Sequence, residues 1–173
     1  MVITGKNFIG NQLSAKGSES YKTYNPSKNI DNKTVFVEAT TEELDEAAAL
    51  AETAFITYSE MPGVKRAAFL NAIADEILNL GTALVDIYCE ETGLPEGRAE
   101  GERGRTVFQL QLFAKMIASE DWRNIVSEKA LPERTPLPKP SLQKTHIPLG
   151  PVAVFGASNF PLAYSTAGGD TAS

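Results

Sequence analysis

Apolar residues recur at steps of three and four positions along three long stretches of the chain, and this period predicts three amphipathic helices. The first helix is expected to begin at Thr41, as its N-cap, and to end before Pro62. The second follows directly, with Gly81 as a joint after which the apolar pattern resumes up to Gly93. The third begins near Pro95, and the positions of its stripe are Ala99, Arg103, Thr106, Val107, Leu110, Phe113, Ala114 and Ile117.

Short runs that favour β-structure precede these helices within residues 1–40. Residues 7–9 and 12–13 flank Gly10-Asn11, a two-residue turn with glycine first, so a hairpin is predicted there. Two further strands are expected at 21–24 and 34–39, with a polar turn over 28–32 between them.

The chain changes character after the third helix, because prolines stand at 132, 136, 138 and 140. Proline excludes a helix and cannot donate to a sheet, so we predict an extended segment over 131–149 with an edge strand at 141–147. Residues 152–155 are then a short apolar run, which is typical of a strand buried on both faces. Asn159 follows small residues, and Pro161 suits a first helical turn, so a ligand-binding strand–turn–helix unit is predicted.

The residues of this unit, Val152-Ala-Val-Phe-Gly-Ala-Ser-Asn159-Phe-Pro161, resemble the aldehyde dehydrogenase superfamily, as do 167–173, 93–96 and 136–140. The resemblance is strongest to the branch of ketoglutarate semialdehyde (2,5-dioxovalerate) dehydrogenases and a related bacterial NADP-dependent fatty aldehyde dehydrogenase. It implies an α/β aldehyde dehydrogenase-like fold, of which this chain holds the N-terminal part. Residues 1–130 would belong to the cofactor-binding domain, 131–149 would form an oligomerisation-type strand, and 150–173 would begin the dinucleotide-binding core with its first Rossmann-like strand.

Composition and charge narrow the classes of partner. A net charge of −6 and a pI near 4.9 argue against a nucleic-acid partner, because phosphates require clustered Lys and Arg. No run of about 18 apolar residues occurs, so no membrane span is expected. The first residues lack the layout of a signal peptide, and the single cysteine has no partner, so a cytoplasmic protein is predicted. Because the sequence stops within a helical pattern, an N-terminal fragment is expected.

Asn159 is the first candidate for chemistry. Its side-chain amide either caps the helix that starts at Pro161 or presents a hydrogen-bond donor just past the strand end. The resemblance implies the second role, as the donor to the oxyanion of a cysteine thiohemiacetal. It also implies that Phe155, Gly156, Ala157 and Ser158 contact NAD or NADP, although Phe155 also suits the core.

The resemblance places Phe160 and Tyr164 along a substrate tunnel, where ordinary packing of a helix start is an equal alternative for Tyr164. Three arginines, Arg98, Arg103 and Arg105, are candidates for binding a substrate carboxylate, because a guanidinium binds a carboxylate with two hydrogen bonds. The alternative is a solvated helix face with Glu–Arg pairs, such as Glu100 with Arg103.

Cys89 and His146 are not expected to be functional. Cys89 lies in a helical stripe beside two glutamates, which raise a thiol pKa, so we interpret it as structural. His146 has no second His or Cys at metal-ligand spacing, so no metal site is predicted. The family's nucleophilic cysteine and general-base glutamate are expected beyond residue 173.

The leading interpretation is an NAD(P)-dependent enzyme that oxidises an aldehyde to a carboxylic acid, with ketoglutarate semialdehyde as first choice of substrate. A fatty or other aliphatic aldehyde is the second choice, and a non-enzymatic helical interaction module is the alternative class. The resemblance implies a homodimer or homotetramer for the complete protein.

Overall fold

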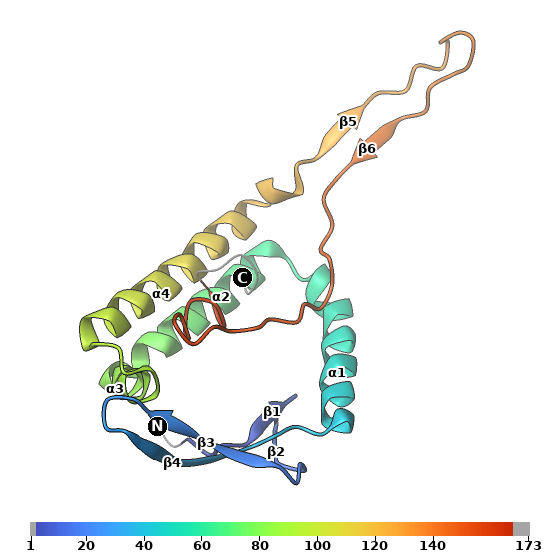
Figure 1. Cartoon of the computed structure of the whole chain (residues 1–173). Helices are drawn as coiled ribbons and strands as arrows, with labels where there is room; N and C mark the ends of the chain where they lie inside the picture. Colours follow the sequence, from blue (N-terminus) through green and yellow to red (C-terminus); the bar gives the residue numbers. More distant parts are fainter. Residues whose placement is uncertain (1–2, 168–173) are drawn as a thin grey trace.

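The computed structural model describes residues 3–167. Figure 1 shows helices α2, α3 and α4 packed together, two small β-hairpins at one end and a long arm at the other. The elements are β1 (Asn7–Ile9), β2 (Gln12–Ser14), β3 (Ser20–Asn25), β4 (Ile30–Val37), α1 (Thr41–Glu60), α2 (Gly63–Asn79), α3 (Gly81–Thr92), α4 (Glu96–Ser119), the 3-10 helix η1 (Asp121–Arg123), β5 (Val126–Glu128) and β6 (Leu142–Lys144).

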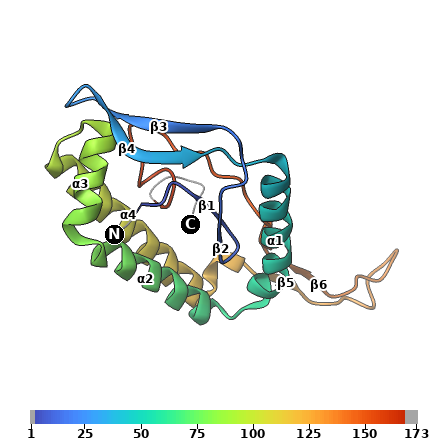
Figure 2. The ribbon, with the colours of Figure 1, turned by 90° about the horizontal axis from the view of Figure 1, so that it is seen from below.

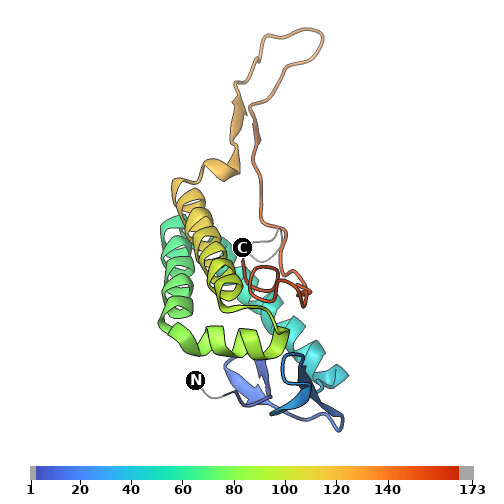
Figure 3. The same ribbon diagram turned by 60° about the vertical axis from the view of Figure 1, so that its left-hand side comes forward.

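The core lies between α2 and α4, which run side by side in opposite directions (Figures 1 and 3). Ala74 from α2 meets Val107 and Leu110 from α4, as the apolar stripes predict. Leu110 is only 2% exposed, and burying such a side chain contributes about 1.5–3 kcal/mol. Gly63 allows the helices to approach closely, because a Cβ there would stand 2.2 Å from the Ile117 carbonyl oxygen.

The joint predicted at Gly81 is confirmed. Gly81 has a φ of +58°, and the axes of α2 and α3 differ by 76° across it. The α3 helix ends at Gly93, whose φ of +70° provides a left-handed cap.

Within residues 3–167 no single helix is long and apolar enough to cross a membrane. The bent α2–α3 pair, taken together, is long and apolar enough by length and composition only.

The N-cap of α1 is Thr40, so the sequence-based assignment to Thr41 is wrong by one residue. The Thr40 hydroxyl accepts from the Glu43 N–H at 3.2 Å, and the Glu43 carboxylate accepts from the Thr40 N–H at 2.9 Å. This is a full capping box, whose glutamate also accepts from the Ser14 hydroxyl on β2. The hydrogen bond from Ser14, followed by that from Thr40, lowers the pKa of Glu43.

The two N-terminal hairpins follow the predicted order. The first is confirmed, with Asn7 opposite Ser14 and a positive φ of 57° at Gly10. In the second, β4 begins at Ile30, so the strand expected at 34–39 was placed too late. Figure 2 shows this second hairpin extending from the α3 side of the molecule towards α1.

The arm is an antiparallel hairpin of β5 and β6 that projects away from the helices (Figures 1 and 3). The strand predicted at 141–147 is confirmed for 142–144 only, and its partner β5 lies before the expected segment of 131–149. Every residue of both strands is exposed. Its part in oligomerisation stays a prediction.

The strand predicted at 152–155 is not formed. This segment is irregular and exposed, with Val152 at 55% and Phe155 at 88%. A strand buried on both faces requires a neighbouring strand for its backbone and helices above and below. Among the residues that the structure describes, no strand pairs with 152–155, so its apolar side chains remain uncovered.

Candidate functional site

A tight turn at residues 157–160 carries Asn159. The Phe160 N–H donates to the Ala157 carbonyl oxygen at 3.1 Å, which closes the turn. One helical turn follows, in which the Tyr164 N–H donates to the Phe160 carbonyl at 3.1 Å. The helix expected from Pro161 is therefore limited to turns within the described residues.

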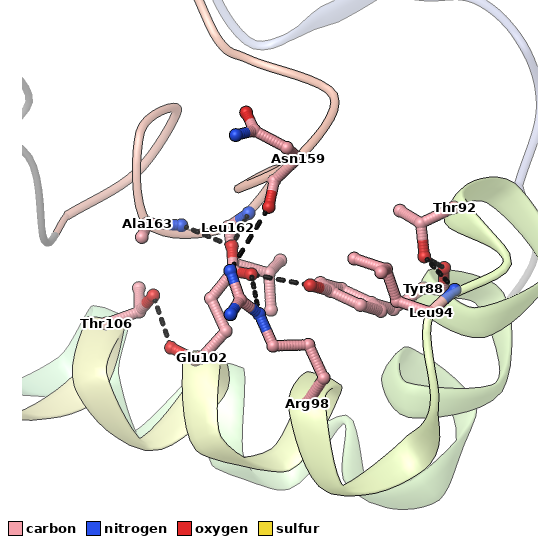
Figure 4. Close-up of polar contacts among 9 residues, drawn as sticks. All are labelled: Tyr88, Thr92, Leu94, Arg98, Glu102, Thr106, Asn159, Leu162 and Ala163. Atoms are coloured by element: carbon pink, nitrogen blue, oxygen red, sulfur yellow. Dashed lines mark hydrogen bonds and ion pairs between the residues drawn. The ribbon is translucent and has the colours of Figure 1, made fainter.

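Glu102 of α4 anchors this segment from below (Figure 4). Its side chain is only 1% exposed, and its Oε1 accepts from the backbone N–H groups of Leu162 at 2.8 Å and Ala163 at 3.0 Å. Its Oε2 accepts from the Tyr88 hydroxyl of α3 at 2.6 Å. Burial, followed by the hydrogen bond to Glu102, raises the pKa of Tyr88.

Arg98, one turn before Glu102 on α4, reaches the turn from the same side. Its guanidinium donates to the Asn159 backbone carbonyl at 3.4 Å, and its Nε lies 3.9 Å from Glu102 Oε2. The guanidinium also stands 4.1 Å from the centroid of the Phe160 ring, and that of Arg105 stands 5.7 Å from the same ring. A cation over an aromatic face is attractive, so both arginines help to place Phe160.

The side chain of Asn159 points away from this network (Figure 4). It is exposed and makes no hydrogen bond to any residue within 3–167. The capping alternative is wrong, because Glu102 accepts from the N–H groups that an Asn159 cap would serve. The fold therefore holds the backbone of Asn159 and leaves its amide available to a ligand.

All the other predicted site residues except Arg103 lie near Asn159. Phe160 and Tyr164 follow it, with ring centroids 5.1 Å apart, and Phe155–Ser158 immediately precede Asn159 in the chain. A groove of about 300 Å³ adjoins the turn and is lined by Gly97, Arg98, Gly101, Glu102, Arg105 and Phe160.

Arg103 is the exception among the predicted residues. Its guanidinium donates to the Gly81 carbonyl at 2.8 Å, so it stabilises the α2–α3 joint and does not reach the turn. The Glu100–Arg103 pair is accordingly not formed in the described part of the chain. The structure thus separates Arg103 from Arg98 and Arg105.

Cys89 is half-buried in α3 beside Val85 and Ala99. Burial, followed by the charges of Glu96 and Asp86, raises its pKa, which disfavours the thiolate. Its interpretation as a structural residue agrees with this environment.

His146 lies at the base of the arm, where its Nδ1 is 3.1 Å from the Trp122 carbonyl oxygen. Within residues 3–167 no group of three or more His, Cys, Asp or Glu side chains is placed so that it could hold a metal ion, and the absence of a metal stays a prediction.

Comparison with known proteins assigns the family. The model of the "Aldehyde dehydrogenase family" matches residues 13–168. The chain belongs to this family. The predicted resemblance to this family is confirmed. The family match favours an oxidoreductase over the alternative of a non-enzymatic helical interaction module.

Two curated relatives are similar along the whole chain. The chain is 48% identical over its full length to alpha-ketoglutaric semialdehyde dehydrogenase 2 of Azospirillum brasilense, of which it covers 33%. It is 46% identical over 96% of its length to alpha-ketoglutaric semialdehyde dehydrogenase of Acinetobacter baylyi, of which it covers 32%. The chain therefore spans about a third of the length of these relatives.

Solved structures share the α/β fold at lower identity. HpcC from Thermus thermophilus superimposes with a TM-score of 0.77 at 20% identity, over 94% of this chain and 30% of the other. An NAD-dependent benzaldehyde dehydrogenase from Corynebacterium glutamicum gives 0.64 at 18% identity, over 78% and 28%. These likenesses confirm the predicted fold class for the N-terminal part.

Sequence reasoning missed Glu102 and Tyr88. The signal was present for Glu102, because it stands three residues after Ala99 and four before Thr106, inside the apolar stripe. A carboxylate at such a position is rarely buried without partners. The sequence pattern favours Arg103 in the same stripe, whereas the structure buries the carboxylate of Glu102.

Proposed function

We propose that this chain forms part of an NAD(P)-dependent aldehyde dehydrogenase in which Asn159 stabilises the oxyanion. The observation that carries the proposal is the Asn159 amide, which is exposed and unbonded within residues 3–167 while its backbone carbonyl is held by Arg98. A donor that the fold leaves unused, on an anchored turn, is preorganised for charge that develops during a reaction.

The proposed reaction begins with attack of a cysteine thiolate on the aldehyde carbon, which forms a C–S bond and puts negative charge on the oxygen. The Asn159 Nδ2–H donates to that oxygen. A hydride then leaves the same carbon as the oxyanion collapses to a thioester, and water cleaves the C–S bond to give the acid and the free thiol. Cys89 is a poor nucleophile because its pKa is raised, so we place the reactive cysteine elsewhere in the complete protein.

NAD or NADP, when bound, accepts the hydride. We propose that residues 155–158 contact it on the side facing Asn159. Gly156 has no side chain, Ala157 has only a methyl group, and residues 155, 156 and 158 are exposed, so a ligand can reach this segment from solvent. The family and the NAD-dependent neighbour support a nicotinamide cofactor, and the choice between NAD and NADP stays open.

We propose ketoglutarate semialdehyde as the substrate and 2-oxoglutarate as the product. The names of the two curated relatives support this choice. A second support is the pair of guanidinium groups at the Phe160 ring, since a semialdehyde carries a carboxylate that requires a cation at the far end of its site.

The test is Asn159→Ala in the protein expressed from the complete gene. Loss of one oxyanion donor is expected to lower kcat by about 10²–10³, with little change in cofactor KM. Asn71→Ala, an exposed asparagine on α2, is the matched control and is expected to leave kcat unchanged. An isotope effect on kcat with a deuterated aldehyde shows whether hydride transfer limits the rate. If hydride transfer is rate-limiting and kcat is unchanged in Asn159→Ala, Asn159 has no part in the mechanism.

A further inference from the structure

One buried carboxylate joins three separate segments of the molecule. Glu102, on α4, accepts a hydrogen bond from Tyr88 on α3 and two from the backbone after Pro161, and it lies 3.9 Å from Arg98. With a side chain that is 1% exposed, it has little water to replace any of these partners. The arrangement concentrates a costly charge at the place where the fold must hold the Asn159 turn.

The two backbone contacts serve a function that helix caps usually serve. The Leu162 and Ala163 N–H groups belong to the first helical turn after Pro161 and have no intrahelical acceptor. A cap normally comes from the preceding residues of the same segment, whereas here α4 supplies it. The direction of the turn is therefore tied to a rigid helix that also packs in the core.

Arg98 completes the connection on the other side of the turn. It lies next to Glu102 and donates to the Asn159 carbonyl, so the carboxylate and the guanidinium together hold the backbone before and after Pro161. The Asn159 side chain branches from the residue whose carbonyl Arg98 holds, three residues before the first N–H group that Glu102 holds (Figure 4). Its direction depends on both.

We propose that Glu102 is a positioning residue for Asn159, with Tyr88 and Arg98 orienting its carboxylate. This inference rests on the proposed function, because it assigns Glu102 a kinetic effect that is exerted through the Asn159 amide. A displacement of about 1 Å in a catalytic group costs on the order of 10²-fold in rate. A shift of the anchored backbone would move the amide by such an amount without touching the substrate.

The first experiment compares Glu102→Gln with Glu100→Gln in the protein expressed from the complete gene. Glutamine keeps the size of the side chain, loses the charge beside Arg98 and places an amide N–H group among donors. We expect kcat to fall about 10- to 100-fold with cofactor KM nearly unchanged. Glu100 is exposed on the same helix, so Glu100→Gln should leave both unchanged. Tyr88→Phe, which removes one donor only, should lower kcat in the same direction by a smaller factor.

A double-mutant cycle with Asn159→Ala separates positioning from general damage. If Glu102 acts through the amide, Glu102→Gln should lower kcat less than about twofold once the amide is absent, because coupled residues are not additive. An equal fold-loss in both backgrounds, for Glu102→Gln and for Tyr88→Phe, would overturn the inference.

Hydrogen exchange gives a measurement that requires no turnover. The Leu162 and Ala163 amides should exchange faster in Glu102→Gln than in Glu100→Gln, with the α2–α4 core unchanged. Unchanged exchange at these two amides would overturn the inference even in a fully active enzyme. If Asn159→Ala leaves kcat unchanged while exchange responds as expected, the proposed function fails and the anchoring of the turn stands.

Discussion

The two arginines at the Phe160 ring should differ in what they contribute to substrate choice. Arg98 and Arg105 both stand over this ring, at 4.1 Å and 5.7 Å, but only Arg98 also donates to the Asn159 carbonyl and lies near Glu102. Replacing Arg105 with Ala should therefore remove charge from the groove while the contacts that Arg98 and Glu102 make with the turn stay in place. Replacing Arg98 with Ala should remove charge from the groove and also disturb the Asn159 turn.

The expected magnitude follows from the exposure of the groove. A hydrogen bond to a charged group contributes about 1.5–3 kcal/mol. The Arg98 side chain is 39% exposed, so solvent screening reduces this value, and we expect about 1–2 kcal/mol for a carboxylate bound here. That free energy corresponds to roughly a 5- to 30-fold increase in KM when the Arg98 charge is removed, and because Arg105 is exposed we expect the lower end of this range for Arg105→Ala.

The assay measures kcat and KM for ketoglutarate semialdehyde and for pentanal, a neutral aldehyde of the same chain length. Arg105→Ala should raise KM for the semialdehyde alone, because it removes binding that is equal in the ground state and the transition state. Arg98→Ala should in addition lower kcat for both aldehydes, since the Asn159 turn loses an anchor.

Arg103→Ala is the matched control, because Arg103 donates to the Gly81 carbonyl away from the groove. It should lower stability without separating the two aldehydes. Equal changes in KM for both substrates in Arg105→Ala would refute the assignment of a carboxylate site to this groove.

Two further predictions concern the stability of the fold. Leu110→Ala should lower the free energy of unfolding, measured in urea, by about 2–5 kcal/mol. The control Leu112→Ala, at a residue that is 47% exposed, should lower it by about 0.5 kcal/mol or less. Similar losses for the two variants would contradict the core assignment. The folded-state pKa of Glu43 is lowered below its ordinary value of 4.5. The stability that the Glu43 carboxylate contributes is therefore fully present above pH 4.5 and is lost as the pH falls through the folded-state pKa. Glu43→Gln should be less stable than the wild type above pH 4.5 and should lose less stability on acidification. Parallel profiles of unfolding free energy against pH for the mutant and the wild type would contradict this prediction.

Helices were predictable because their signals are local. The apolar stripe that includes Leu110 and the joint at Gly81 depend on residues within a few turns of one another. The N-cap was missed by one position because Thr40 and Thr41 are equally good cap residues. Counting three residues on from Thr40 would have found Glu43 and the capping box.

The segment at 152–155 was harder, since a short apolar run specifies a buried strand only if neighbouring strands exist to pair with it. The partners of Glu102 were unpredictable for a related reason. Tyr88 and Leu162 stand 14 and 60 residues away from it, and only the packing of α3, α4 and the turn brings them together. The location of Asn159 at an accessible turn was predictable from its motif, but the anchors that hold it were not.

The spacing of residues along α4 limits the insertions and deletions that this protein can accept. Arg98 and Glu102 face the Asn159 turn, while Leu110, two turns further on, faces α2. One residue added or removed between them would rotate one set relative to the other by about 100°, because a helix has 3.6 residues per turn. Relatives with an altered length should carry the change elsewhere, above all in the exposed tip of the arm at 131–138, where neither the core nor the turn depends on it.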